Sequence, residues 1–384
     1  MIRVFILAGE PSGDKLGGAL MAGLRELHPD IAFEGVGGVQ MEAQGLASQF
    51  PMSELSVMGI AEVLPKYRAL KRRIRQTADH VIRSKPDLLI TIDSPDFSLR
   101  VAKRVKAACD VRTVHYVAPT VWAWRPKRVQ KIANCVDHLL ALFPFEPAYF
   151  TPHGIDCDFV GHPVVNEPLA TDQDAAAFRQ AHDIGDAPLL MVLPGSRQGE
   201  VSRLAPVFGD TVGQLMARRP NLRVVVPVAA PVAETVKAAV QDWPGQPIVL
   251  DPRGWNLDQA NQRKRTAFKA ADVALAASGT VSLELAAART PMVIAYKMHW
   301  LSFRIIKAMA LVDTVTLVNL VSDTRVVPEY LGPSCISDDI AKGLAQVLDR
   351  PEDQIDAMNT TMDRLGEGGE APGLRAARAV LTRM

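Results

Sequence analysis

The sequence predicts an α/β protein of two tandem domains, each a doubly wound parallel β-sheet covered by helices, and three observations support this prediction. The chain has 384 residues, which is too many for one ordinary core and suits two. Hydrophobic residues make up 48% of it and charged residues 22%, as expected for a globular protein. Short runs of β-type residues alternate with helical patterns, and such alternation is typical of parallel sheets with right-handed crossovers.

The first domain is predicted to span residues 1–165. A run of β-type residues, Arg3–Ala8, is followed by leucines at helical spacing between Leu16 and Leu27. Further strands are expected at Leu88–Ile92, Arg112–Val117, Leu139–Leu142 and Cys157–Val160. The stretch Gly161–Asp174 is rich in Pro, polar and small residues and is interpreted as a linker.

The second domain is predicted to span residues 166–345, and residues 346–384 are set apart as a helical tail. Its strands are expected at Leu189–Leu193, Arg223–Pro227, Ile248–Leu250, Val273–Ala276 and Met292–Ala295. In the tail, the stretch GEGGEAPG precedes a last helix, Leu374–Met384. Ligands of doubly wound sheets bind outside the carboxyl ends of the strands, and two such domains in tandem can bring those ends face to face across a cleft.

Bulk charge and hydropathy exclude several classes of protein. The formal net charge is +1, which argues against a nucleic-acid binder acting through overall charge. The first residues are predicted to form a strand rather than a signal peptide, and no stretch approaches the roughly 18 apolar residues that span a bilayer. The chain is therefore expected to be soluble or peripheral. Its four cysteines match no zinc spacing and are interpreted as free thiols.

Carboxylates follow two predicted strands of the first domain. Glu10 lies in the turn GEPSGD, where it could accept hydrogen bonds from sugar hydroxyls; the alternative is a capped turn before a helix. Asp93 and Asp96 lie in IDSPDF, directly after Leu88–Ile92, and carboxylates at a strand tip suit general-base catalysis. Asp96 has the alternative role of starting the helix that follows.

Two segments of the first domain suggest contact with an amphiphile or a membrane. The loop HYVAPTVWAWRPKRV places Trp122 and Trp124 beside Arg125, and such aromatic rings stack on sugars or lie at lipid headgroups. Core packing of the two tryptophans is the alternative. A basic run within residues 66–75, next to the apolar stretch Val57–Ala61, suits an anionic lipid surface; a solvated helix face is the alternative. The run includes Lys71, Arg72 and Arg73.

Two turns of the second domain are predicted to bind phosphate. In LPGSR, Ser196 and Arg197 are placed to contact a diphosphate, unless the segment is an ordinary Pro-Gly turn. In ASGTVSLE a strand gives way to a helix, so backbone N–H groups would point at a bound phosphate, unless this is only a capped helix start. The residues concerned are Ser278, Gly279 and Thr280, with Glu284 one turn further on as a candidate acceptor for ribose hydroxyls.

These stretches resemble the lipid-A-disaccharide synthases, a family of GT-B glycosyltransferases with two Rossmann-like domains facing across a cleft. The resemblance runs in order from residue 8 to about residue 320. The loop HYVAPTVWAWRPKRV is very specific to the family. The matching stretches are AGEPSGD, SVMGIAEVL, IDSPDF, HYVAPTVWAWRPKRV, FPFE, VGHP, LPGSRQGEV, ASGTVSLE and the asparagine of LVNL, Asn319.

The resemblance implies a reaction in lipid A and lipopolysaccharide biosynthesis. The sugar 2,3-diacylglucosamine would pass, with inversion, from UDP-2,3-diacylglucosamine to 2,3-diacylglucosamine 1-phosphate (lipid X). The products would be UDP and the β-1,6-linked disaccharide phosphate of lipid A. Asp93 takes the place of the general base, while Glu10, Arg197 and Asn319 match positions tied to activity, and Asn319 is expected to contact the UDP-sugar. The family implies a cytoplasmic enzyme, peripheral on the cytoplasmic face of a Gram-negative inner membrane that is rich in anionic phospholipid, and a homodimer is compatible with it.

No cofactor or metal is expected. The two spacings that suit a metal-binding acidic pair, Asp156/Asp158 and Asp172/Asp174, flank the linker, away from the predicted phosphate turns. The chain departs from the family pattern at Ser94 and in the loop Asp251–Thr266, where uracil contacts are left open. Two rival functions are a UDP-sugar epimerase or other lipid-linked sugar transferase on the same fold, and a non-catalytic binding module, which would bind ligand without turnover.

Overall fold

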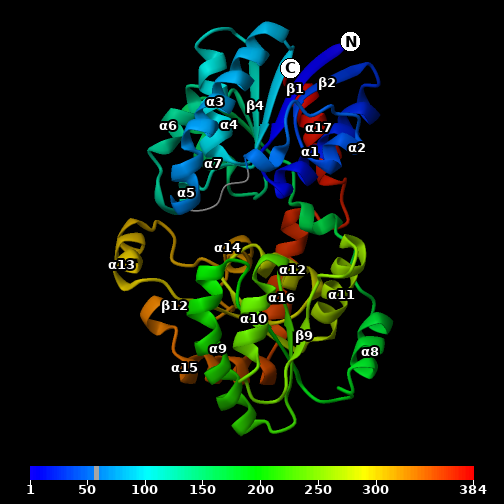
Figure 1. Cartoon of the computed structure of the whole chain (residues 1–384), viewed down its shortest axis with the longest axis vertical. Helices are drawn as coiled ribbons and strands as arrows, with labels where there is room; N and C mark the ends of the chain where they lie inside the picture. Colours follow the sequence, from blue (N-terminus) through cyan, green and yellow to red (C-terminus); the bar gives the residue numbers. More distant parts are fainter. Residues whose placement is uncertain (56–59) are drawn as a thin grey trace. The chain divides into compact units, whose positions relative to one another are not determined.

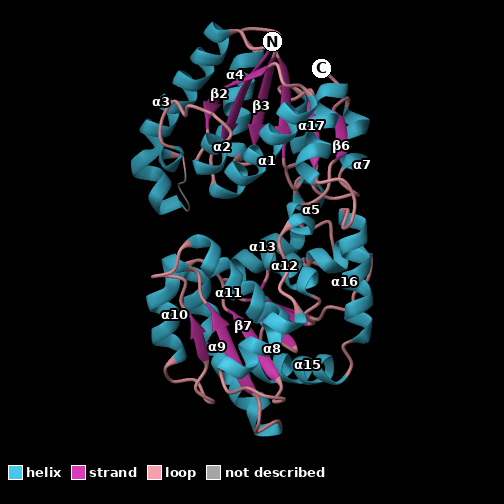
Figure 2. Cartoon of the chain, turned by 90° about the vertical axis from the view of Figure 1, so that its right-hand side faces the viewer, coloured by secondary structure: helices cyan, strands magenta, loops and turns pink. Residues whose placement is uncertain are grey.

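The structure is a computed structural model that describes residues 1–55 and 60–384, with only the backbone described for residues 60–66. It divides into two units (Figures 1 and 2). The first unit comprises Met1–Asn166 together with Leu365–Met384, and the second comprises Glu167–Arg364. The expected α/β class with two parallel sheets is confirmed, because each unit contains one six-stranded parallel sheet.

The sheet of the first unit has the strand order β2-β1-β3-β4-β5-β6. Its strands are β1 (Ile2–Ala8), β2 (Ile31–Val36), β3 (Leu88–Ile92), β4 (Arg112–Tyr116), β5 (His138–Ala141) and β6 (Asp156–Phe159). Ala8 of β1 pairs with Ile92 of β3, which pairs with Tyr116 of β4. The residues that follow these three strands therefore meet at one edge of the sheet.

Helices of the first unit cover the sheet with apolar faces. They are α1 (Pro11–Leu27), α2 (Val39–Ala43), α3 (Ile60–Ser84), α4 (Pro95–Lys106), α5 (Val121–Trp124), α6 (Arg128–Ala133), α7 (Pro147–Phe150) and α17 (Pro372–Thr382). Helix α1 buries Leu16, Leu20 and Leu24 at the spacing that the sequence predicts. On α4, Val101 and Val105 enter the core with Phe5 and Leu89 of the sheet.

Helix α17 belongs to the first unit although the chain reaches it through the second. It lies beside α1 in both views (Figures 1 and 2). The two helices approach so closely that a Cβ atom on Gly23 would lie 2.8 Å from the carbonyl oxygen of Gly373. The apolar face of α17, with Ala376, Ala377 and Val380 buried, explains why these residues return to α1 rather than standing apart as a tail.

The sheet of the second unit has the strand order β12-β11-β10-β7-β8-β9. Its strands are β7 (Leu189–Leu193), β8 (Arg223–Pro227), β9 (Ile248–Leu250), β10 (Val273–Ala277), β11 (Met292–Tyr296) and β12 (Glu329–Leu331). Its helices are α8 (Asp172–Ala181), α9 (Gln198–Arg218), α10 (Ala233–Val240), α11 (Leu257–Ala270), α12 (Val281–Ala288), α13 (Trp300–Met309), α14 (Leu317–Ser322), α15 (Ser337–Asp349) and α16 (Glu352–Leu365). The carboxyl ends of β7, β8, β9 and β10 share one edge.

The predicted strands agree with the observed ones to within one residue at each end. The two edge strands β2 and β12 were not predicted from the sequence. The expected loop Asp251–Thr266 is only partly correct, because α11 begins at Leu257. Asn256 and Gln259 form a reciprocal capping box that starts this helix. Within the described residues, no helix combines the length and the apolar character needed to cross a bilayer.

Candidate functional site

The first candidate site lies where two turns of the first unit touch. The β1–α1 turn carries Gly9 and Glu10, and the β3–α4 turn carries Ser94. A Cβ atom on Gly9 would lie 2.7 Å from Ser94 Oγ, so only glycine permits this approach. The Ser94 hydroxyl donates a hydrogen bond of 3.3 Å to Glu10 Oε1. Glu10 and the IDSPDF turn, which are distant in sequence, are thus brought together.

Backbone strain is concentrated at this edge. Asp93 and Ser94 both have left-handed φ angles, +49° and +43°, and Val117, which follows β4, has φ +79°. Such conformations cost about 1–3 kcal/mol each in residues other than glycine, and they are kept only where contacts with the surrounding structure outweigh this cost. The Asp93 N–H donates to the carbonyl of Tyr116 at 2.9 Å, and the Ser94 N–H donates to Asp93 Oδ1 at 2.7 Å. The Asp93 carboxylate is therefore held in a defined position at the strand tip.

Asp96 differs from Asp93 in its surroundings. It is an exposed residue in the first turn of α4, and the cap position of that helix belongs to Ser94, whose side chain makes no capping bond. The helix begins at Pro95, so Asp96 adds a favourable charge near the helix N-terminus, and its role as a base stays a prediction.

Asp14, the last residue of GEPSGD, has a structural role that the sequence interpretation missed. Its buried carboxylate accepts hydrogen bonds from the backbone N–H groups of Gly38, Gln40 and Met41, at 2.8, 2.9 and 3.1 Å. It therefore caps α2 rather than its own helix. The turn thus combines a candidate functional carboxylate, Glu10, with a carboxylate that fixes the neighbouring loop.

Trp122 does not lie at the surface, so the expected membrane role of this residue is wrong. Its side chain is 6% exposed, and its Nε1 donates to Glu146 Oε1 at 3.2 Å. Its ring meets Phe145 edge to face, with centroids 5.0 Å apart. Burial raises the pKa of Glu146 to about 7, although the N–H groups of Leu142 and Phe143 also bind this carboxyl group. The alternative of core packing is correct for Trp122.

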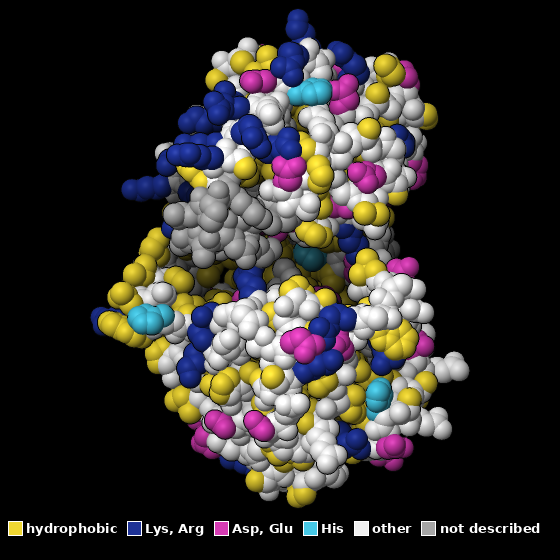
Figure 3. All heavy atoms as spheres, viewed as in Figure 1, with side chains coloured by type: hydrophobic (Ala, Val, Ile, Leu, Met, Phe, Trp, Pro, Cys, Tyr) yellow, Lys and Arg dark blue, Asp and Glu magenta, His cyan; other side chains and the backbone are white. Residues whose placement is uncertain are grey.

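Other residues expected at an acceptor or a membrane are accessible. Trp124 is half-buried, and the guanidinium carbon of exposed Arg125 lies 3.9 Å from the centroid of its ring. On α3, Lys71 and Arg72 are exposed, and basic side chains gather over this part of the first unit in Figure 3.

Arg73 is engaged within the protein. It forms two hydrogen bonds with Glu54, at 2.6 and 2.8 Å, and stacks on Phe50. It therefore suits the lipid role less well than its neighbours on α3. Of the expected membrane segment 57–75, residues 57–59 and the side chains of residues 60–66 lie outside the described part of the chain.

The second candidate site lies in the second unit, and the PGSR turn forms one side of it. Gly195 has φ +112°, and a Cβ atom there would lie 2.7 Å from Glu200 Oε2, so the turn requires glycine. Arg197 stands at the N-cap of α9 with a side chain that is 65% exposed. It forms a loose ion pair of 3.4 Å with Glu200. The guanidinium is thus close to the helix N-terminus and accessible to an anion.

The β10–α12 turn forms the opposite side of this site. Ser278, Gly279 and Thr280 precede the first residue of α12, and a Cβ atom on Gly279 would meet no atom within 4 Å. The turn is therefore open beside Gly279, and it leads directly into the N-terminus of α12. Glu284 extends from the first turn of α12, and its carboxylate is paired with Lys264 of α11 at 2.6 Å.

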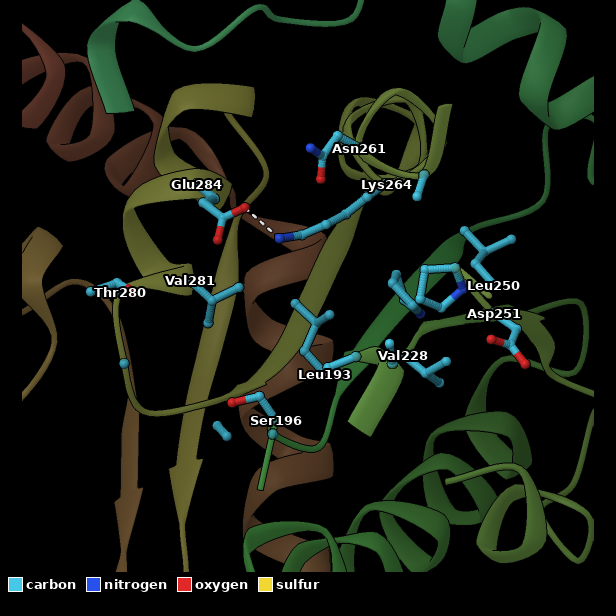
Figure 4. Close-up of a pocket in the computed structure, with 18 of the residues that line it drawn as sticks. Leu193, Ser196, Val228, Leu250, Asp251, Asn261, Lys264, Thr280, Val281 and Glu284 are labelled. Carbon is cyan, nitrogen blue, oxygen red and sulfur yellow. Dashed lines mark hydrogen bonds and ion pairs between the residues drawn. The ribbon is translucent and has the colours of Figure 1, made fainter. Parts of the chain in front are cut away.

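A cavity of about 670 Å³ connects these turns (Figure 4). Its size and mixed lining suit a small polar ligand with an apolar part. It contains the expected Ser196, Arg197, Ser278, Gly279, Thr280 and Glu284. It also contains residues that the sequence interpretation missed, among them Val228, Leu250, Asp251, Trp255, Asn261, Arg263 and Lys264. The Trp255 ring, with the Arg263 guanidinium 4.3 Å from its centroid, offers a flat surface to a planar base.

Asn319 does not line this cavity, which corrects the expectation that it contacts the UDP-sugar there. Its side chain is 1% exposed, and both ends of its amide are used. The Nδ2 group donates to Thr314 Oγ1 and to the Val327 carbonyl, while Oδ1 accepts from the Val327 N–H at 3.0 Å. These bonds fix the segment between α13 and β12, which is a structural role.

The acidic pairs near the linker are engaged in other contacts. Asp158 accepts from His138 at 2.8 Å and pairs with Arg383, which also pairs with Asp156 at 3.1 Å. Asp174 completes the capping box of α8. Within the described part of the chain, no group of three or more His, Cys, Asp or Glu side chains could hold a metal ion. Metal independence of the reaction stays a prediction.

Comparison with protein families and with relatives gives one consistent match. A family model described as lipid-A-disaccharide synthetase matches residues 4–377. A lipid-A-disaccharide synthase of Ruegeria pomeroyi is 63% identical over 384 residues, covering 100% of this chain and 96% of the relative. One of Pseudomonas aeruginosa is 42% identical over 382 residues, covering 99% and 97%.

Solved structures resemble the fold at much lower sequence identity. A UDP-GlcNAc 2-epimerase from Neisseria meningitidis bound to UDP-GlcNAc matches with a TM-score of 0.63 and 12% identity, over 100% of this chain and 99% of that one. Anabaena HepE in complex with UDP and glucose matches with a TM-score of 0.57 and 12% identity, over the whole of both chains. Both similarities concern the arrangement of the backbone, which is that of GT-B enzymes.

Proposed function

The chain belongs to the lipid-A-disaccharide synthase family of glycosyltransferases, and from this premise we propose its substrates and the roles of its residues. The donor is UDP-2,3-diacylglucosamine and the acceptor is 2,3-diacylglucosamine 1-phosphate. The acceptor 6-hydroxyl attacks the anomeric carbon of the donor, the bond from that carbon to the UDP oxygen breaks, and a β-1,6 linkage forms with inversion. The hydroxyl proton passes to a base of the protein.

The base in this proposal is Asp93. A base must lie in a fixed position and be able to reach its substrate, and the half-buried Asp93 carboxylate is held by the strained turn after β3. Glu10 accepts a hydrogen bond from the Ser94 hydroxyl of the β3–α4 turn. It would bind sugar hydroxyls and also support the β3–α4 turn. Asp96, exposed and on the helix, is the less suitable base.

The UDP site in this proposal is the cavity of the second unit. Its two helix starts and Arg197 provide the positive potential that a diphosphate requires, and they would stabilise the charge that develops on the leaving UDP. Glu284 would accept ribose hydroxyls, and Trp255 would lie against the uracil ring. The single observation that carries the proposal is this cavity of about 670 Å³, which is large enough for a nucleotide and is lined by residues of the PGSR and ASGT turns.

An assay with both diacyl sugars tests the proposal. We expect release of UDP that depends on the acceptor, and a β-linked disaccharide phosphate detected by NMR of the anomeric proton. UDP release with the donor alone, together with formation of a 2-epimer, would favour an epimerase. Binding of both sugars without turnover would indicate a binding module.

We further propose that the enzyme is peripheral on the cytoplasmic face of the inner membrane, with the exposed basic face of α3 on anionic lipid. The double change Lys71→Ser and Arg72→Ser should weaken sedimentation with anionic vesicles about fivefold per residue. Arg73→Ser should mainly destabilise the protein, because Arg73 is paired with Glu54. Equal vesicle binding by the parent and the double variant would leave α3 a solvated helix face.

A further inference from the structure

Helix α13 presents large apolar side chains to solvent. It follows β11, and none of its residues is buried. Seven of the sixteen large apolar residues that are exposed in the described part of the chain lie in this helix or within six residues after it. They are Trp300, Leu301, Ile305, Ile306, Met309, Leu311 and Val315, with exposed fractions from 38% to 59%. Exposed apolar residues gathered in this way mark an interaction surface more often than chance scatter.

The helix is attached to its unit by a small contact. The ring of Phe303 lies against Gly332 of the 3₁₀ turn Gly332–Ser334, where a Cβ atom would be only 2.5 Å from the ring. The backbone N–H of Leu301 is capped by the His299 side chain at 3.4 Å. The remaining faces of α13 are therefore open, and the helix forms without a core of its own.

The open faces have an amphipathic arrangement. Leu301, Ile305 and Met309 recur every four residues and so form one apolar stripe, with Ile306 beside it. Arg304 and Lys307, three residues apart, lie on another face of the helix. In Figure 3 hydrophobic side chains dominate the surface over α13, with basic ones at its margin.

The charge of the segment has one sign. Between Tyr296 and Asp313 the chain contains three basic residues, Lys297, Arg304 and Lys307, and no acidic one. Asp313 itself is paired with Arg325 at 2.6 Å. The chain as a whole has nearly equal numbers of basic and acidic residues, 43 and 42. The cationic character of α13 is therefore local.

We propose that α13 docks in the plane of an anionic lipid bilayer. Its apolar stripe would enter the boundary between headgroups and acyl chains, while Arg304 and Lys307 contact lipid phosphates. Trp300, at the start of the helix, suits the headgroup level. A helix of ten residues is about 15 Å long, so it lies on the membrane rather than spanning it.

A second copy of the chain is the less suitable occupant. A two-fold contact through the apolar stripe would cover Leu301 and Ile305 but leave Arg304 and Lys307, on another face, without an anionic partner, because the segment between Tyr296 and Asp313 has no acidic residue. Anionic headgroups neutralise these charges directly. Docking of α13 is independent of the proposed reaction, because it depends only on the surface of this helix.

The test measures binding of the full chain to vesicles. The parent and the triple variant Leu301→Ser, Ile305→Ser, Ile306→Ser are sedimented with vesicles of phosphatidylcholine, with and without phosphatidylglycerol. The variant should lose at least about tenfold in partitioning to anionic vesicles, since each side chain loses its apolar burial. The matched control is Leu169→Ser, Ile336→Ser, which removes apolar side chains of similar exposure elsewhere in the second unit and should bind as the parent does.

Two further measurements separate lipid docking from a loss of folding and from adsorption through another surface. Because α13 does not line the cavity, UDP affinity should be the same in the triple variant and the parent, which also shows that the fold is intact. Brominated lipids should quench tryptophan emission in the parent, and Trp300→Phe should remove a distinct part of that quenching.

Three results would overturn the proposal. The parent fails to bind anionic vesicles, or the triple variant binds them as the parent does. In the third, sedimentation velocity shows a dimer of the parent that the triple variant cannot form, while vesicle binding is unchanged; this result would assign α13 to a second copy of the chain.

Discussion

The two units share a parallel α/β architecture, yet the turns at the carboxyl ends of their strands differ in charge and in strain. In the first unit the turns after β1 and β3 carry carboxylates, Glu10 and Asp93. In the second unit the turn after β7 carries Arg197, and the turns after β7 and β10 each lead into a helix N-terminus. The same position of one fold is thus acidic in one unit and suited to anions in the other.

The turns at the carboxyl ends of the strands also differ in backbone strain between the two units. Non-glycine residues adopt left-handed angles after β3 and β4, at Asp93, Ser94 and Val117. Among the described residues that line the cavity of the second unit, the left-handed position is a glycine, Gly195. Under the proposed roles, the strain after β3 holds the Asp93 carboxylate in the one orientation that a general base requires. A UDP site formed by helix starts and Arg197 would not need a strained side chain.

Removal of the Asp93 carboxylate should have the largest effect. Asn is nearly isosteric with Asp and keeps the backbone but cannot accept the proton, so Asp93→Asn should lower the single-turnover rate by roughly 10²–10⁴. UDP affinity should stay the same. Asp96→Asn is the control and should change the rate far less. A collapse in the Asp96 variant with a normal rate in the Asp93 variant would move the base to Asp96; normal rates in both would favour Glu10.

Glu146 of the first unit should affect the pH dependence of stability rather than catalysis. Burial raises the pKa of Glu146 to about 7, so the folded state holds this proton more tightly than the unfolded state. The contribution of this group to the free energy of unfolding is fully present below the unfolded pKa of about 4.5. It is lost as the pH rises through about 7, and the loss amounts to up to about 3 kcal/mol. In urea unfolding experiments, the free energy of unfolding of the Glu146→Gln variant should change less with pH over this range than that of the parent. An unchanged slope would mean that Glu146 is ionised throughout.

Removal of the accessible guanidinium should weaken the second site. Arg197→Ala should raise the dissociation constant for UDP by roughly 10- to 150-fold, as expected for the loss of a charge-assisted hydrogen bond of about 1.5–3 kcal/mol. Calorimetry measures it, and Arg218→Ala, at the other end of α9, is the matched control. If both variants bind UDP alike, the diphosphate does not lie at the PGSR turn.

Relief of strain should have the smallest effect on stability. Ser94→Gly removes the cost of a left-handed serine, which is about 1–2 kcal/mol, and adds an entropic cost of about 0.5–1 kcal/mol. The free energy of unfolding should therefore rise by about 0–1.5 kcal/mol, while turnover falls because the turn is less rigid and the hydrogen bond from Ser94 to Glu10 is lost. Lys85→Gly, at another left-handed position, should stabilise to a similar degree and leave turnover unchanged. Equal turnover in all three proteins would mean that the strain serves no catalytic purpose.

Most of the fold could be predicted from sequence because central strands are continuous buried runs. Leu88–Ile92 and Leu189–Leu193 are buried at every position and stand out clearly. Strands β2 and β12 lie at sheet edges, contain Glu34 and Glu329, and are only partly buried, so they lack this signal. The packing of α17 on α1 depends on tertiary contacts that no local pattern reveals.

The candidate sites could be predicted in outline, because charged or glycine-rich turns follow predicted strands. The roles of single residues depend on partners that are distant in sequence. Trp122 is interior because it binds Glu146, and Glu284 is paired with Lys264 of α11. Trp255 reaches the cavity because a capping box starts α11 just after it. Such partners become visible only when the chain is folded.

The return of α17 to the first unit has a consequence for synthesis on the ribosome. Residues 167–364 must be made before α17 can cover α1, which at roughly 5–20 residues per second takes on the order of 10–40 s. During that interval the nascent first unit exposes the close-packing surface around Ala19 and Gly23. The first unit is begun first and completed last, so the nascent chain depends on this surface staying free of other contacts until translation is nearly finished.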